Sequence, residues 1–170
     1  MKALVVYESM FGNTEQVARA ISDGLSEHLE VELVEVTEAP PEITEPVDLI
    51  VVGGPTHAFS MTRQSTREEA IKKGASHGSE AIGLREWLEH LHSDGRRPAD
   101  RMATFDTRVD KVRHLPGSAA KSAAKIAHKL GFEVAAKPES FYVQDVEGPL
   151  LDGELDRAQA WGQQLGLTGR

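Results

Sequence analysis

Apolar and polar positions follow two distinct patterns along the chain. Short, mainly hydrophobic runs without alternation occupy residues 3–7, 48–52 and 102–105, which is typical of strands buried on both faces of a parallel sheet. A further strand is predicted at residues 31–36, where Glu32 and Glu35 favour a position at the edge of the sheet. The fifth strand is predicted within residues 132–143, most clearly at residues 140–143.

Helical periodicity separates these five strands. Hydrophobic residues recur three or four positions apart in the segments 17–29, 84–91, 119–130 and 153–165. Asn13, with Gln16 three residues later, is the expected N-cap of the first helix. Because strand and helix alternate, residues 1–170 are predicted to form one α/β domain with a doubly wound, five-stranded parallel sheet and right-handed crossovers.

Residues 60–79 depart from both patterns. They are polar, and a helical stretch near residues 66–73 has almost no apolar face. Gly74 and Gly78 follow it, so the segment is expected to be a mobile excursion from the fold. Trp87 and Trp161 lie on amphipathic helices and are expected in the core.

Composition narrows the classes of function. The chain has 19 basic and 27 acidic residues, a formal net charge of −8, which disfavours binding to nucleic acid or to an anionic membrane. There is no cysteine, so any redox chemistry requires a bound cofactor. His90 and His92 are two residues apart on one helix and face different directions, so no metal site is assigned, and no catalytic motif is visible. The first apolar run is too short for a membrane span, and a cytoplasmic location is expected.

The loop after the first strand carries the most specific signal. It joins a buried strand to the N-terminus of a helix, where free backbone N–H groups and the helix dipole favour an anion. Gly12 lets the backbone approach a ligand closely, and three side chains add hydrogen-bonding groups. These are Ser9, Asn13 and Thr14.

This loop resembles the phosphate-binding loop of the flavodoxin family. An apolar strand that ends in an aromatic residue is followed by x-[S/T]-x-x-G-x-T, with a small residue, here Ala18, four positions further on. The resemblance implies the sheet order 2-1-3-4-5 and FMN as the cofactor. It also implies which residues hold the FMN phosphate through side chains and backbone amides: Ser9, Met10, Phe11, Gly12, Asn13 and Thr14.

The resemblance places the flavin ring beside two further loops. After the third strand it implies contacts from Pro55, Thr56, His57, Ala58 and Phe59; after the fourth, from Asp106, Thr107 and Arg108. Simpler interpretations stay open: Phe59 as a cap on the core, His57 as a solvated neighbour, and Arg108 as a surface cation near Asp106 or Asp110.

The leading hypothesis is an FMN-binding redox protein that mediates electron transfer, with a redox partner protein or a small-molecule acceptor. No aromatic residue lies between Asp106 and Arg113 to cover the outer flavin face. This departure from the family pattern, together with residues 60–79, favours an alternative, an NAD(P)H-dependent quinone oxidoreductase of the same fold. A flavin-free interaction module is a third possibility. The oligomeric state is left open.

Overall fold

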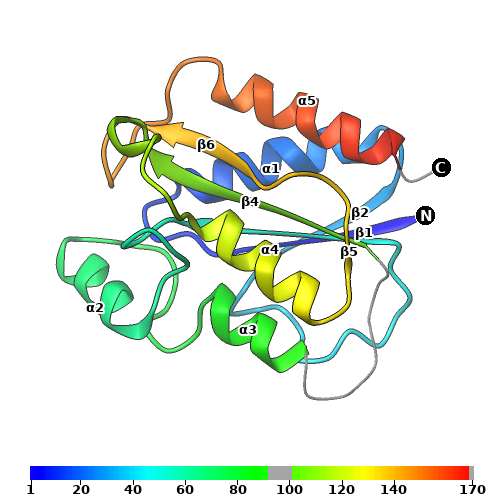
Figure 1. Ribbon diagram of the computed structural model, residues 1–170, viewed down its shortest axis with the longest axis horizontal. Helices are drawn as coiled ribbons and strands as arrows, with labels where there is room; N and C mark the ends of the chain where they lie inside the picture. The colour runs from blue at the N-terminus through cyan, green and yellow to red at the C-terminus, as the bar shows by residue number, and fades with distance from the viewer. Residues whose placement is uncertain (92–100, 169–170) are drawn as a thin grey trace.

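A parallel sheet forms the centre of the computed structural model, which describes residues 1–91 and 101–168 (Figure 1). Its strands lie in the order β2-β1-β3-β4, with two further strands paired to β4, and every pairing is parallel. The strands are β1 (Lys2–Tyr7), β2 (Glu30–Glu35), β3 (Leu49–Pro55), β4 (Arg101–Val109), β5 (Glu133–Val134) and β6 (Glu139–Val143). The predicted doubly wound α/β fold with order 2-1-3-4-5 is therefore confirmed.

The fifth position of the sheet is divided, which adds a sixth strand to the five predicted. β5 pairs with Arg101 and Met102, whereas β6 pairs with the later part of β4, from Phe105 to Val109. Pro138 immediately precedes β6. Because proline has no N–H to donate to a ladder, it is tolerated at the start of an edge strand but not within a continuous one.

Helices cover both faces of the sheet. The helices are α1 (Asn13–Ser26), α2 (Gln64–Lys72), α3 (Leu84–Leu91), α4 (Ala119–Lys129) and α5 (Glu154–Leu167), with a short 3-10 helix η1 (Asp110–Val112). In Figure 1, α1 and α5 lie on one face and α3 and α4 on the other, while α2 lies at the end towards which the strands point. Ligands bind at this carboxyl edge in open α/β sheets.

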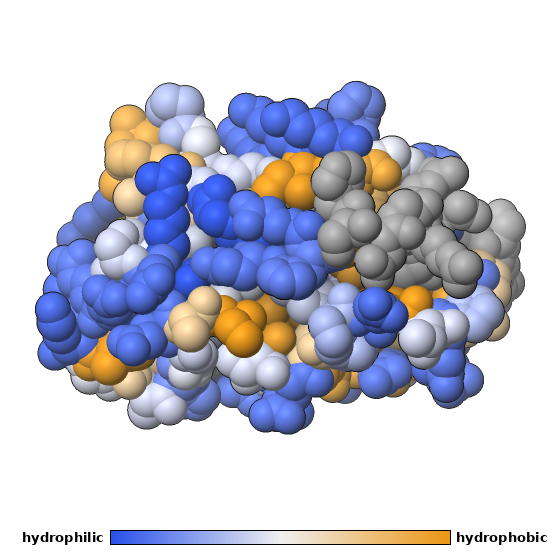
Figure 2. All heavy atoms as spheres, turned by 90° about the horizontal axis from the view of Figure 1, so that it is seen from below, coloured by the Kyte–Doolittle hydropathy of each residue, from blue (hydrophilic) through white to orange (hydrophobic). Residues whose placement is uncertain are grey.

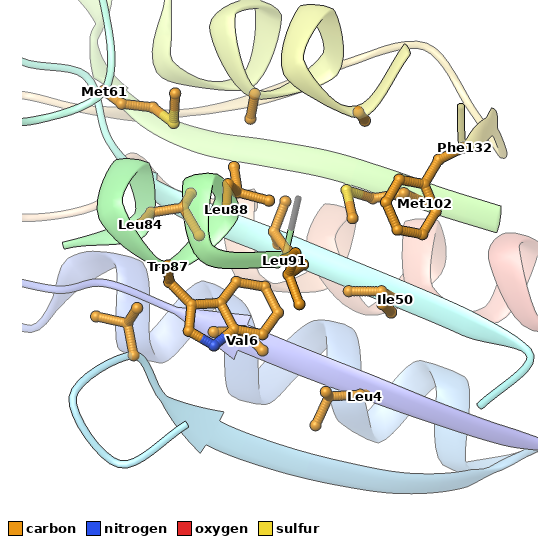
Figure 3. Packing of buried hydrophobic residues seen from close by; sticks show 14 of the residues in the cluster. Leu4, Val6, Ile50, Met61, Leu84, Trp87, Leu88, Leu91, Met102 and Phe132 are labelled. Carbon is orange, nitrogen blue, oxygen red and sulfur yellow. The ribbon is translucent and has the colours of Figure 1, made fainter. Parts of the chain in front are cut away.

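Two hydrophobic clusters fill the space between sheet and helices. Trp87 of α3 packs with Leu84, Leu88 and strand residues such as Val6 in the cluster drawn in Figure 3. On the other face, Trp161 packs edge-to-face against two phenylalanine rings, Phe105 and Phe141, with ring centroids 6.1 to 6.4 Å apart. Trp87 is 4% and Trp161 9% exposed, so the prediction that both belong to the core is confirmed.

The strand β4 extends further than the hydrophobic pattern predicts. β4 continues to Val109, so Asp106, Thr107 and Arg108 lie within the strand and not in the loop after it. The polar side chains end the apolar run in the sequence, but the backbone stays in register with β6. The strand therefore carries polar groups to the carboxyl edge of the sheet.

The face of the molecule drawn in Figure 2 is mainly hydrophilic, and its hydrophobic residues form small separate patches. No helix within residues 1–91 and 101–168 is long and apolar enough to cross a membrane. Across the same residues, no group of three histidine, aspartate or glutamate side chains is arranged to hold a metal ion.

Candidate functional site

The first loop turns the chain sharply from β1 into α1. Gly12 has φ +91°, in the left-handed region, and it is the N-cap of the helix. The expectation that Asn13 caps the helix is wrong: Asn13 is the first helical residue, and its side chain makes no cap bond. The hydroxyl of Ser9 stabilises the turn instead, because it accepts hydrogen bonds from the amides of Gly12 (3.1 Å) and Glu15 (3.3 Å).

Within residues 10–14, four backbone amides are left without an acceptor in the described part of the chain. They belong to Met10, Phe11, Asn13 and Thr14. Met10 and Thr14 are each 1% exposed, and backbone N–H groups at buried positions are rarely left unpaired. The amides lie at the positive end of the α1 dipole. A group with several acceptor oxygens and negative charge fits this loop, as a phosphate does.

A hydrogen bond joins the first loop to the sheet edge. The hydroxyl oxygens of Thr14 and Thr107 are 2.7 Å apart, and either one can be the donor. Both residues are buried. The structure thus brings together the first loop and the end of β4, as the resemblance implies.

The second loop forms a tight hairpin after β3. His57 and Ser60 exchange two backbone hydrogen bonds, and the two residues between them, Ala58 and Phe59, have φ of 49° and 62°. Positive φ at both central positions is the pattern of a type I′ turn. Phe59 is 49% exposed, so the interpretation that it caps the core is wrong. His57 is half-buried, and burial lowers the pKa of its imidazole, so it is largely neutral at pH 7.

Two of the expected flavin-side residues cap α4 instead. Thr56 accepts a hydrogen bond from the amide of Ala119, and Asp106 accepts one from the amide of Ala120, each at 2.9 Å. Ser118, the N-cap, accepts from Lys121. Burial raises the pKa of the Asp106 carboxyl, whose second oxygen has no hydrogen-bond partner in the described structure. The side chains of Thr56 and Asp106 therefore accept hydrogen bonds from the first amides of α4. The backbone amide of Thr56 also donates to the Thr107 carbonyl.

Arg108 lies beneath the third loop, residues 110–118, which joins β4 to α4. It is 3% exposed and donates through Nη2 to the carbonyls of Val112 (2.9 Å) and Leu115 (2.5 Å). The interpretation of Arg108 as a surface cation is therefore wrong. Alternation along β4 explains its direction, because Asp106 and Arg108 share one face while Thr107 points to the other.

Sequence reasoning missed a buried polar cluster next to the first loop. Glu8 is 1% exposed and accepts a 2.7 Å hydrogen bond from the amide of Leu84 and another from the Thr62 hydroxyl. Arg67, fully buried, donates to the same hydroxyl and pairs with Glu86 at 2.6 Å. Burial raises the pKa of Glu8. Only the position of Glu8, directly after a buried strand, hinted at its burial.

This cluster also accounts for the polar segment 60–79. α2 buries only Arg67 and Ala70 among its residues, which agrees with the predicted lack of an apolar face. The helix is attached to the fold by the Arg67 guanidinium and not by an apolar stripe. The mobility of the segment stays a prediction.

A hollow of about 370 Å³ opens at the same edge of the sheet, between the end of β4 and the loop before α5. It is lined by Asp110, Lys111, Gln144, Asp145, Gly148 and Leu151. Gly148 borders the first loop, since a Cβ placed on it would lie 2.6 Å from Oδ1 of Asn13. The sheet edge beside the free amides is therefore partly open.

Comparison with a family model agrees with this site. The model of the flavodoxin family matches residues 5–80, which include the second half of β1, the first loop, α1 and the second loop. This match supports assigning the chain to the flavodoxin family and confirms the resemblance carried by the first loop. No curated protein sequence gives a significant match.

Solved structures share the fold along nearly the whole chain. Flavodoxin 2 from Bacillus cereus is 19% identical, with a TM-score of 0.69 and 97% of each chain covered. A flavodoxin from the domain Archaea is 20% identical, with a TM-score of 0.64 and 99% of each chain covered. Rubredoxin oxygen:oxidoreductase from Desulfovibrio gigas is 16% identical, with a TM-score of 0.69; the match covers 99% of this chain and 36% of that longer one. At these identities the likeness establishes the fold.

Proposed function

We propose that the protein binds FMN at the first loop and acts as a flavin-dependent redox protein that mediates electron transfer. The observation that carries the proposal is the set of four free amides in residues 10–14, which surround a left-handed Gly12 at the N-terminus of α1. The family match over residues 5–80 includes this loop and supports the same cofactor. A redox partner protein or a small-molecule acceptor would complete the reaction.

The residues present fit the cofactor unequally along its length. The free amides and the Thr14 hydroxyl suit the phosphate. For the ring, the backbone of the second loop, His57 and the exposed Phe59 are available at the sheet edge. Thr56, Asp106 and Arg108 are engaged with α4 and the third loop, so their part in this proposal is to shape the edge against which the ring lies. Bound FMN would supply one- and two-electron chemistry.

Flavin titration tests the proposal. Apoprotein should quench FMN fluorescence with high affinity and bind riboflavin, which lacks the phosphate, at least about tenfold more weakly. Equal affinity for the two flavins would contradict the assignment of the phosphate loop, and binding of neither would favour the flavin-free interaction module.

The same protein preparation distinguishes an electron carrier from an NAD(P)H-dependent enzyme. The FMN-loaded protein is mixed anaerobically with NADPH, first alone and then with a quinone. For an electron carrier, the flavin absorbance should persist until a separate reductase is added. Rapid bleaching by NADPH alone, reversed by the quinone, would move the assignment to the NAD(P)H-dependent quinone oxidoreductase.

A further inference from the structure

The segment that follows α2 lies directly on the first loop. The amide of His77 donates to the carbonyl of Met10 at 3.2 Å. Gly78, at φ +77°, packs so closely that a Cβ there would lie 2.6 Å from Sδ of Met10 and 2.9 Å from the Ser9 carbonyl oxygen. Residues 77–78 are thus in contact with the backbone that carries the free amides.

This contact brings the imidazole of His77 to Gly12. From the position that a Cβ on Gly12 would take, Cε1 of His77 is 3.5 Å away and Nε2 is 3.9 Å away. Gly12 separates Phe11 from Asn13, whose amides are both free in the described structure. The ring therefore stands beside the place where an anion on these amides would lie.

Two neighbours orient the ring. Nδ1 lies 3.0 Å from the Ser76 hydroxyl, and Nε2 lies 3.7 Å from the Glu15 carboxylate. When the Ser76 hydroxyl donates to Nδ1, the imidazole is neutral and carries its proton on Nε2; when the ring is protonated, both nitrogens carry a proton and Nδ1 donates to the Ser76 oxygen instead. In both states an N–H donor is present on the edge of the ring nearest α1.

The first loop has no basic side chain of its own to bind an anion. There is no lysine or arginine between Tyr7 and Gln16, although a phosphate monoester has a charge of about −1.5 to −2 at neutral pH. Glu15, whose carboxylate lies 3.7 Å from Nε2 of the ring, pairs with Arg19 at 2.8 Å. His77, which comes from a distant part of the chain, is placed to add a side-chain donor to the free amides of residues 10–14.

We propose that His77 is a binding residue for the FMN phosphate, to which it donates a hydrogen bond from Nε2 across Gly12. The inference rests on the proposed FMN site and assigns part of the polar segment 60–79 to cofactor binding. Since the His77 side chain is 45% exposed, its removal is not expected to disturb the core.

The experiment compares two flavins on four proteins. Wild type, His77→Ala, His77→Gln and His128→Ala are titrated with FMN and with riboflavin by fluorescence quenching, after circular dichroism shows that each is folded. His128, an exposed residue near the end of α4, is the matched control for losing a histidine. The glutamine variant keeps an N–H donor near the position of Nε2.

We expect His77→Ala to weaken FMN binding about tenfold or more and riboflavin binding less than about twofold, with partial recovery in His77→Gln. The control should match wild type. If wild type prefers FMN and His77→Ala binds it equally well, the inference fails and the FMN proposal stands. An equal loss for both flavins would make His77 a packing residue and also overturn the inference. If wild type shows no preference for FMN, both proposals fail.

Discussion

The carboxylate of Glu8 lies 2.7 Å from the backbone nitrogen of Leu84, the first residue of α3. It therefore holds the N-terminus of α3 against the end of β1, one residue before the phosphate loop begins. The negative charge is favourable at a helix N-terminus, but the side chain is 1% exposed and its burial is costly. Burial outweighs the hydrogen bonds, and the pKa of Glu8 is raised.

This raised pKa predicts a specific dependence of stability on pH. At a pH above 4.5, the ordinary pKa of a glutamic acid carboxyl, the native state keeps the Glu8 proton, whereas the unfolded chain releases it. The native state then binds more protons, so the free energy of unfolding falls with rising pH by up to about 1.4 kcal/mol per unit until Glu8 is ionised in both states. Glu8→Gln removes this slope, and the variant should gain stability relative to wild type as pH rises above 4.5.

Urea unfolding at half-unit steps from pH 4.5 to 8 measures the difference. Asp106, whose pKa is also raised by burial, is present in both proteins and cancels in the comparison. Glu89→Gln, which removes an exposed carboxylate on α3, controls for the loss of one negative charge. Stability curves of wild type and Glu8→Gln that run parallel throughout would show that Glu8 does not titrate in this range.

The same residue shows where sequence reasoning reached its limit. Apolar runs and helical periodicity are local, and they predict β1, β3, α1 and α3 because those elements bury whole faces. The burial of Glu8 depends on Thr62 and Arg67, more than fifty residues away in the chain, so no local pattern contains it. For the same reason the pattern ended β4 at Phe105, although pairing with β6 extends it to Val109.

Thr56 provides a test between a structural and a flavin-binding role. Thr56→Val keeps the shape of the side chain and removes the acceptor for the amide of Ala119. The free energy of unfolding should fall by about 1 to 2 kcal/mol, since a helix N–H is left unpaired. Ser118→Ala removes a neighbouring cap and should cost about as much. Denaturant unfolding measures both losses of stability. If Thr56→Val is as stable as wild type but binds both FMN and riboflavin more weakly, Thr56 contacts the flavin and does not serve mainly as a cap of α4.

Within the first loop, Thr14 should matter for the phosphate alone. Thr14→Ala removes a hydroxyl expected to bond a charged group, which should weaken FMN binding by about 1.5 to 3 kcal/mol and leave riboflavin binding nearly unchanged. Thr107→Val is the matched control, because it breaks the same 2.7 Å contact but leaves the Thr14 hydroxyl in place. A loss in Thr107→Val as large as that in Thr14→Ala would show that the contact between loop and strand, and not the phosphate, explains the effect.

The family motif predicted this loop, because the motif consists of residues close in sequence, and it placed the end of β4 at the same edge of the sheet. The motif correctly placed Thr56, Asp106 and Arg108 near the carboxyl edge of the sheet, but it could not predict the direction in which their side chains point. That direction depends on the length of β4 and on the position of α4, to which two of them bind. His77 was missed because the contact between residues 77–78 and the first loop joins parts of the chain more than sixty residues apart.

The hairpin turn of the second loop is the last feature with a measurable consequence. Ala58 has φ 49° without being glycine, a conformation that costs about 1 kcal/mol for a residue with a Cβ. Asparagine tolerates this region better than alanine, and valine, being branched at Cβ, tolerates it worse. Ala58→Asn should therefore raise the free energy of unfolding by several tenths of a kcal/mol, and Ala58→Val should lower it by about 1 kcal/mol or more. Because Ala58 is exposed, packing does not oppose either change. Denaturant unfolding of the three proteins measures the order of stability; valine equal to alanine would mean that residue 58 does not keep its left-handed backbone in solution.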